Sequence, residues 1–238
     1  MRINKSKIIL FTLCLVVVMS GCGAAQTAMD QTAVGGHIDF ERLAELNPEI
    51  FAWVYVPGTG IDQPVLQSAE SDTYYEDHNW EKKEDEEGSL YTEMANLMNM
   101  CDFNTIIHGH TTDTETMLSG LHKVREKDFF DHNGQVYVYL PDNVLTYEVI
   151  ACYTEDRHSI IRDYNLTDYK ECVQYIEDMQ KLTYDNGIYR EGWEEITPYH
   201  FLLSFVTDCP EDEDKQYVVT AILVRDTAGT INRTVYQY

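Results

Sequence analysis

The sequence predicts a mainly β fold with a few helices, and two observations carry this prediction. Short runs rich in apolar, β-branched and aromatic residues recur between turn signals along most of the chain, which is the pattern of strands. Two longer segments place apolar residues at helical spacing, one near residue 40 and one at residues 167–182, and a helical turn is expected through Met117 and Leu121. With 44% hydrophobic and 12% aromatic residues, the 238-residue chain can bury the core of one domain and carry an appendage.

The first 21 residues have the composition of a secretory signal peptide. A basic start precedes an apolar run at residues 8–18, which is shorter than the about 20 residues that span a membrane. The run ends at Gly21 and Cys22, a pattern that resembles the bacterial lipobox. We therefore expect Cys22 to be lipidated and to become the new N-terminus, and the alternative is an uncleaved signal anchor. Both alternatives place the protein outside the cytoplasm, on the outer face of a bacterial cell membrane.

The next segments predict a tether followed by the start of a folded domain. Residues 22–37 are small and polar, as in flexible linkers. Residues 39–50 are amphipathic and predict a helix that Pro48 breaks or restarts. A strand at 52–56, a turn at 57–60 and an extended segment at 61–67 follow. We expect the domain to occupy residues 38–226, with a C-terminal tail at 227–238.

The middle and end of the chain supply the remaining elements. Residues 81–87 are a charge run and predict a solvated loop. Residues 167–182 predict a long helix, because their apolar positions recur at helical spacing. The apolar runs between and after these segments predict strands at 89–92, 105–107, 135–140, 144–153, 199–206 and 217–224, of which the third and fourth form a hairpin.

Cys209 lies directly after a buried strand and before the acidic loop 211–214. A cysteine in this place is held by a rigid frame and remains accessible to a substrate, as nucleophiles often are. The alternative is a half-buried structural thiol, because free cysteines commonly behave as small hydrophobes.

A cysteine nucleophile needs a basic or cationic neighbour, and His110 is the candidate. His108, Gly109 and His110 follow a short strand and precede a polar loop, where a side chain can reach a cleft. Two alternatives stay open for these histidines: one ring can point into the core, or the pair can bind metal. A zinc site needs three or four ligands, and no further Cys or His lies close in sequence, so we expect no metal.

Four blocks of the sequence resemble class B sortases, the cysteine transpeptidases of Gram-positive cell surfaces. In order and spacing they match the family's opening helix-to-strand segment, its next hairpin region, its histidine strand and its cysteine strand. The blocks are NPEIFAWVYVPGTGIDQPV at 47–65, YYEDHNWEKKEDEEGSLY at 74–91, NTIIHGH at 104–110 and VTDCPEDEDKQYVV at 206–219. The resemblance implies a closed β-barrel with an N-terminal helix and a long helix before the cysteine strand. Residues 105–110 and 201–209 must then form neighbouring strands.

The resemblance also implies a function and its residues. His110 takes the position of the catalytic acid and base, and Cys209 takes that of the nucleophile. The enzyme would cleave a sorting-signal peptide of a secreted protein and transfer it to an amine acceptor on peptidoglycan or a pilin, without a cofactor. The family's arginine is replaced: Gln216 stands at its position, and Lys215 is a possible substitute for its charge. Three other arginines are further candidates for that role, namely Arg157, Arg162 and Arg225.

Charge narrows the possible partners. The formal net charge of −24 excludes a nucleic-acid partner, because nucleic-acid binding requires a basic surface, and it favours ligands with basic flanks. Of six cysteines, four remain after loss of the signal peptide and lipidation of Cys22, and disulfides are possible outside the membrane. A second hypothesis is a sortase-like lipoprotein that has lost catalysis and binds peptides in its groove. Whether the sulfur of Cys209 and the ring of His110 face one groove separates the two hypotheses.

Overall fold

The computed structural model describes residues 38–112 and 116–235. The predicted signal peptide, the lipidation site Cys22 and the tether up to residue 37 lie outside the described residues. In the part of the chain that is described, no helix has the length and apolar character needed to cross a membrane. The elements are α2 (Phe40–Leu46), β1 (Ile50–Val56), β2 (Ile61–Leu66), η1 (Tyr74–Glu76), β3 (Leu90–Tyr91), β4 (Asn104–His108), η2 (Ser119–Arg125), α3 (Lys127–His132), β5 (Gln135–Leu140), β6 (Asn143–Asp156), α4 (Ile160–Asp163), α5 (Tyr169–Asn186), β7 (Gly187–Tyr189), β8 (Leu202–Asp208) and β9 (Lys215–Asp226).

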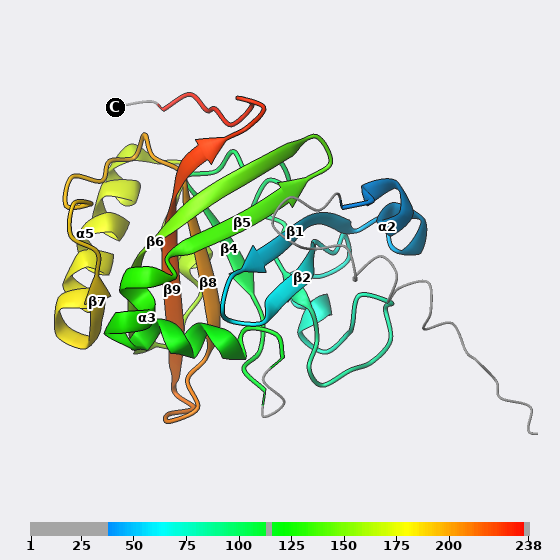
Figure 1. Ribbon diagram of the computed structural model, residues 1–238, viewed down its shortest axis with the longest axis horizontal. Helices are drawn as coiled ribbons and strands as arrows, with labels where there is room; N and C mark the ends of the chain where they lie inside the picture. Colours follow the sequence, from blue (N-terminus) through cyan, green and yellow to red (C-terminus); the bar gives the residue numbers. More distant parts are fainter. Residues whose placement is uncertain (1–37, 113–115, 236–238) are drawn as a thin grey trace, which may run out of the picture.

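The strands form a closed β-barrel, as predicted. Eight of them pair in the ring β5-β1-β2-β3-β4-β8-β9-β6, and the pairing of β5 with β6 closes it. β7 adds to β6 outside this ring, and α5 lies along the same side of the barrel, opposite α2 (Figure 1). Closure matters for solubility because it leaves each barrel strand paired on both sides.

The predicted neighbours of the sheet are confirmed. β4 and β8 run parallel, with Asn104 opposite Leu202 and His108 opposite Val206. β5 and β6 form the predicted hairpin, in which Gln135 pairs with Glu148. β8 and β9 are antiparallel and place Asp208 opposite Gln216. The two strands expected to carry the site are therefore adjacent.

The boundaries of the two predicted helices differ from the expectation. α2 ends at Leu46 because Asn47, which precedes Pro48, is extended, with φ −151° and ψ 110°. The first strand consequently begins at Ile50, two residues before the predicted start. α5 begins at Tyr169, where the carboxylate of Asp168 accepts bonds from the amides of Lys170 and Glu171.

Three hydrophobic clusters hold these elements together. One fills the barrel and includes Leu203, Phe205, Tyr217 and Val219. A second lies between the outer face of the sheet and α5, and it includes Val206 and Val218. The third lies around β1 and α2. Along β8 and β9, odd-numbered residues thus face the barrel interior and even-numbered residues face outward, as the pleat requires.

Candidate functional site

The outward face of β4, β8 and β9 carries the candidate site. Extending the β4–β8 register by two residues from the pair His108–Val206 places His110 opposite position 208. Asp208 in turn lies opposite Gln216 on β9. All three side chains line an open groove of about 250 Å³. Three neighbouring strands therefore contribute to one site, and Asp208 lies at its centre.

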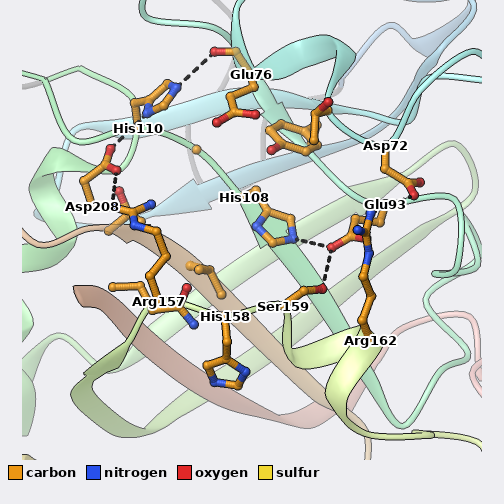
Figure 2. A pocket seen from close by; sticks show the side chains of 16 residues that line it. Asp72, Glu76, Glu93, His108, His110, Arg157, His158, Ser159, Arg162 and Asp208 are labelled. Atoms are coloured by element: carbon orange, nitrogen blue, oxygen red, sulfur yellow. Dashed lines mark hydrogen bonds and ion pairs between the residues drawn. The ribbon is translucent and has the colours of Figure 1, made fainter. Parts of the chain in front are cut away.

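Asp208 is the partner of His110. Its Oδ2 lies 2.9 Å from His110 Nδ1 and accepts the amide hydrogen of Thr111 at 3.1 Å. Its other oxygen, Oδ1, accepts a bond from Arg157 Nη2 at 3.0 Å. The bond from His110, together with the bonds from Arg157 and Thr111, lowers the pKa of Asp208 despite its partial burial. Figure 2 shows the row Glu76, His110, Asp208 and Arg157 along one side of the groove.

Both ring nitrogens of His110 face acceptors. Nδ1 meets the carboxylate of Asp208, and Nε2 lies 3.0 Å from the backbone carbonyl of Glu76. A neutral imidazole carries one N–H, so only the imidazolium can donate both bonds. The hydrogen bond to Asp208 accordingly raises the pKa of His110, although burial opposes this. The groove thus holds a histidine–carboxylate pair at its centre.

Cys209 lies on the other side of the strand. Its sulfur is 3.7 Å from Arg125 Nη2 and 3.2 Å from Glu211 Oε2, and the residue is 6% exposed. Arg125 also stacks on the ring of Tyr217, 4.4 Å from its centroid, at the end of the barrel interior. The expected meeting of Cys209 with His110 in one groove is therefore corrected. Side-chain alternation explains it, because a shift of one residue moves a side chain to the opposite face.

The side chains of Gln216 and Lys215 also point to opposite faces of their strand. Gln216 is 2% exposed, lines the groove and donates from Nε2 to Glu155 at 3.0 Å. Lys215 points to Asp156, with 2.8 Å between Nζ and Oδ1. Of the other arginines considered, Arg157 and Arg162 line the groove, whereas Arg225 lies near the end of β9 and pairs with Thr146 of β6. Arg157 therefore supplies a positive charge beside Asp208, which the sequence had offered only as one of several candidates.

The opposite side of the groove is built around Glu93. Its Oε1 lies 3.5 Å from His108 Nε2 and 3.3 Å from Ser159 Oγ, and Oε2 lies 3.6 Å from Arg162. His108 and His110 thus pair with different carboxylates (Figure 2). Within the described ranges, no group of three or more His, Cys, Asp or Glu side chains could hold a metal ion. The pair therefore acts in two separate charge networks.

Two residues of the site were missed by sequence reasoning. Arg125 beside Cys209 had no signal, because it lies in a short 3₁₀ segment with no recognisable pattern. Asp208 has a signal once the pairing of the two strands is known: His110 and Asp208 follow the outward-facing positions His108 and Val206 by two residues each. Counting faces along both strands would have selected Asp208 over Cys209 as the neighbour of His110.

The curated proteins that are similar to this chain carry the same name. No family profile matches the chain. Sortase B of Listeria monocytogenes is 28% identical over 174 residues, which cover 69% of this chain and 68% of that protein. Sortase B of Staphylococcus aureus is 22% identical over 187 residues, covering 78% and 75%.

Solved structures of the same name share the fold. A mutant form of Clostridium perfringens sortase B has a TM-score of 0.70 at 23% identity, over 78% of this chain and 86% of that one. Sortase B from B. anthracis has a TM-score of 0.71 at 21% identity, over 84% and 93%. A Staphylococcus aureus sortase B–substrate complex has a TM-score of 0.67 at 21% identity, over 78% and 84%.

Proposed function

We infer that the chain belongs to the class B sortase family, a family of cysteine transpeptidases, and we propose that it uses the sortase groove to bind peptides without thiol catalysis. Sortases act at the cell envelope, and we propose the same place for this chain, as a lipoprotein on the outer face of the bacterial membrane. Its ligands would be peptide segments of secreted proteins.

The register of the site strands supports this proposal most directly. The residue opposite both His110 and Gln216 on the groove face is Asp208, so a carboxylate stands where a nucleophile would have to be. A carboxylate held by His110, Arg157 and the Thr111 amide has its acceptor oxygens occupied and its charge neutralised. Such a group favours a stable binding site over attack on an amide carbonyl.

The decisive experiment compares the parent with variants that move the thiol. A sorting-signal peptide library is incubated with the parent, with Cys209→Ala and with the double variant Asp208→Cys, Gln216→Arg, and covalent acyl-protein is read by mass spectrometry. We expect no acyl-protein from the parent and equal noncovalent peptide binding by the parent and Cys209→Ala. We expect the double variant to form acyl-protein, because its new thiol faces His110 and an arginine lies opposite.

A second candidate function is the transpeptidase with Cys209 as nucleophile. One observation favours it: the sulfur of Cys209 lies 3.7 Å from the guanidinium of Arg125, a cation of the kind that activates thiols. In that case the parent forms acyl-protein on Cys209 and passes the peptide to an amine acceptor on peptidoglycan or a pilin. Acyl-protein formed by the parent and lost in Cys209→Ala would replace the binding proposal by this one.

A further inference from the structure

The groove continues past His110 into a second open cavity of about 600 Å³. Thr73, Glu76 and His110 line both cavities, so Glu76 lies at their junction. Asp77 and Glu86 also line the second cavity and add negative charge there. An extended ligand that occupied both parts would pass over Glu76.

The other groove carboxylates are neutralised by protein cations. Asp208 is paired with His110 and Arg157. Asp72 and Glu93 share Arg162, which lies 3.5 Å and 3.6 Å from them, and Glu93 also faces His108. Figure 2 shows these pairs on the two sides of the groove.

The cationic side chains in these pairs already lie against carboxylates of the protein. His158, the remaining one, lies 3.2 Å from Glu155 and 2.7 Å from Asp163, and the hydrogen bond with Glu155 raises its pKa to about 9. Among the described residues, none forms an ion pair with the exposed Glu76 carboxylate. The Glu76 carbonyl lies 3.0 Å from His110 Nε2, and the charge of the Glu76 carboxylate adds to the raised pKa of His110 without an ion-pair contact. The second cavity is therefore lined by the carboxylates of Glu76, Asp77 and Glu86 and by His110, whose ring already bonds Asp208.

We propose that the groove is selective for peptides carrying a lysine or arginine side chain, and that the Glu76 carboxylate receives this cation. This inference rests on the proposed peptide-binding function and names its ligand class. The net charge of −24 attracts cations to the whole surface, whereas Glu76 fixes where along the peptide the cation must lie. Exposure of Glu76 favours such a pair, because little desolvation opposes it.

The test uses an array in which every peptide is present with lysine and with acetyl-lysine, so that the two forms differ by one charge. The detergent-solubilised full chain is the binder. The parent is expected to prefer the lysine form by about 1.5- to fivefold, the range for one exposed ion pair. Glu76→Gln should remove this preference while still binding the acetylated peptides.

The matched control is Glu177→Gln, which makes the same change of net charge on an exposed position of α5 that does not line the groove. It should keep the parental preference. Equal binding of both peptide forms by the parent, or an equal loss of preference in the two variants, would overturn the role of Glu76 and leave peptide binding intact. Absence of binding to any array peptide would instead overturn the proposed function together with this inference.

Discussion

His110 joins three segments of the chain through hydrogen bonds. It follows β4, contacts Asp208 at the end of β8 through Nδ1, and contacts the carbonyl of Glu76 in η1 through Nε2. Each contact joins residues 34 or more positions apart, so the charge state of one ring affects how the two sides of the groove are held. The ring is 32% exposed, which leaves the pair partly screened by solvent.

The stability contributed by this pair depends on pH in both directions. The pKa of His110 is raised by its bond to Asp208, so its contribution is complete below the unfolded value of about 6.5 and is lost as pH rises through the folded pKa. The pKa of Asp208 is lowered, chiefly by His110, so its contribution is complete above about 4 and is lost as pH falls through the folded pKa. The pair is therefore most stabilising between these limits.

We expect His110→Gln to lower the free energy of unfolding by about 1–2 kcal/mol near pH 5.5 and by less at pH 9. Denaturant melts of the parent and variant across this pH range measure the difference. His132→Gln is the control, because His132 is exposed and pairs with Asp128 of its own helix. A difference that stays constant from pH 5.5 to 9 would show that His110 is not titrating as an ion-pair partner.

A second prediction at the residue scale concerns the thiol of Cys209 and the side chain of Gln216. Gln216 lies opposite Asp208 on the outward face, whereas Cys209 contacts Arg125 near the barrel interior. Gln216→Arg should therefore leave the iodoacetamide alkylation rate of Cys209 unchanged within about twofold, because the new charge lies nearest Asp208 and Glu155. In an Asp208→Cys, Cys209→Ala background, the same substitution should accelerate alkylation severalfold. Acceleration of Cys209 itself would place both side chains on one face.

At the scale of elements, local pattern predicted the sheet better than the short helices. The hairpin of β5 and β6 was predictable because a clean alternation precedes the turn at Pro141-Asp142-Asn143. The 3₁₀ segment η1 and the four-residue α4 were not, because segments of three or four residues show too few periods to recognise. β7 was missed because its three residues are strand only through pairing with β6.

Part of the groove lining was predictable from the sequence. His110 and Gln216 reach the groove as expected, and their strands are neighbours. Position 208 rather than 209 shares their face, and that difference depends on where β8 ends and how it registers with β4. Local sequence does not set the register of a strand. The register is set by which residues are buried on each face, with Leu203 and Phe205 packed inside the barrel and Leu202 and Val206 packed outside it.

The start of α5 offers a prediction for an element. Asp168 caps this 18-residue helix by accepting from the amides of Lys170 and Glu171 at 2.9 Å and 3.1 Å. Asp168→Ala should lower the free energy of unfolding by about 1 kcal/mol, because two amides lose their acceptor. Asp168→Ser, which keeps a capping oxygen, should recover most of this loss in the same thermal melts. Equal destabilisation by both substitutions would argue against a capping role.

For the whole molecule, closure of the barrel and excess negative charge act together. Closure pairs both edges of each barrel strand, so solubility does not depend on edge residues. A net charge of −24 repels the domain from anionic lipid headgroups. The proposed place at a membrane therefore needs a covalent or inserted anchor, and we propose that the segment with Cys22 supplies it.

The anchor gives the last prediction. If Cys22 is lipidated, the mature chain begins there, and Cys22→Ala should move the protein from the membrane fraction to the soluble fraction or leave an uncleaved precursor. Cell fractionation and N-terminal mass spectrometry distinguish these products, and Cys101→Ala is the control because it removes a thiol from the folded domain without touching the anchor. A Cys22→Ala chain that fractionates like the parent and has the same N-terminus would favour the uncleaved signal anchor. The acidic domain would then be held by residues 8–18, and peptide capture at the membrane surface would depend on insertion rather than acylation.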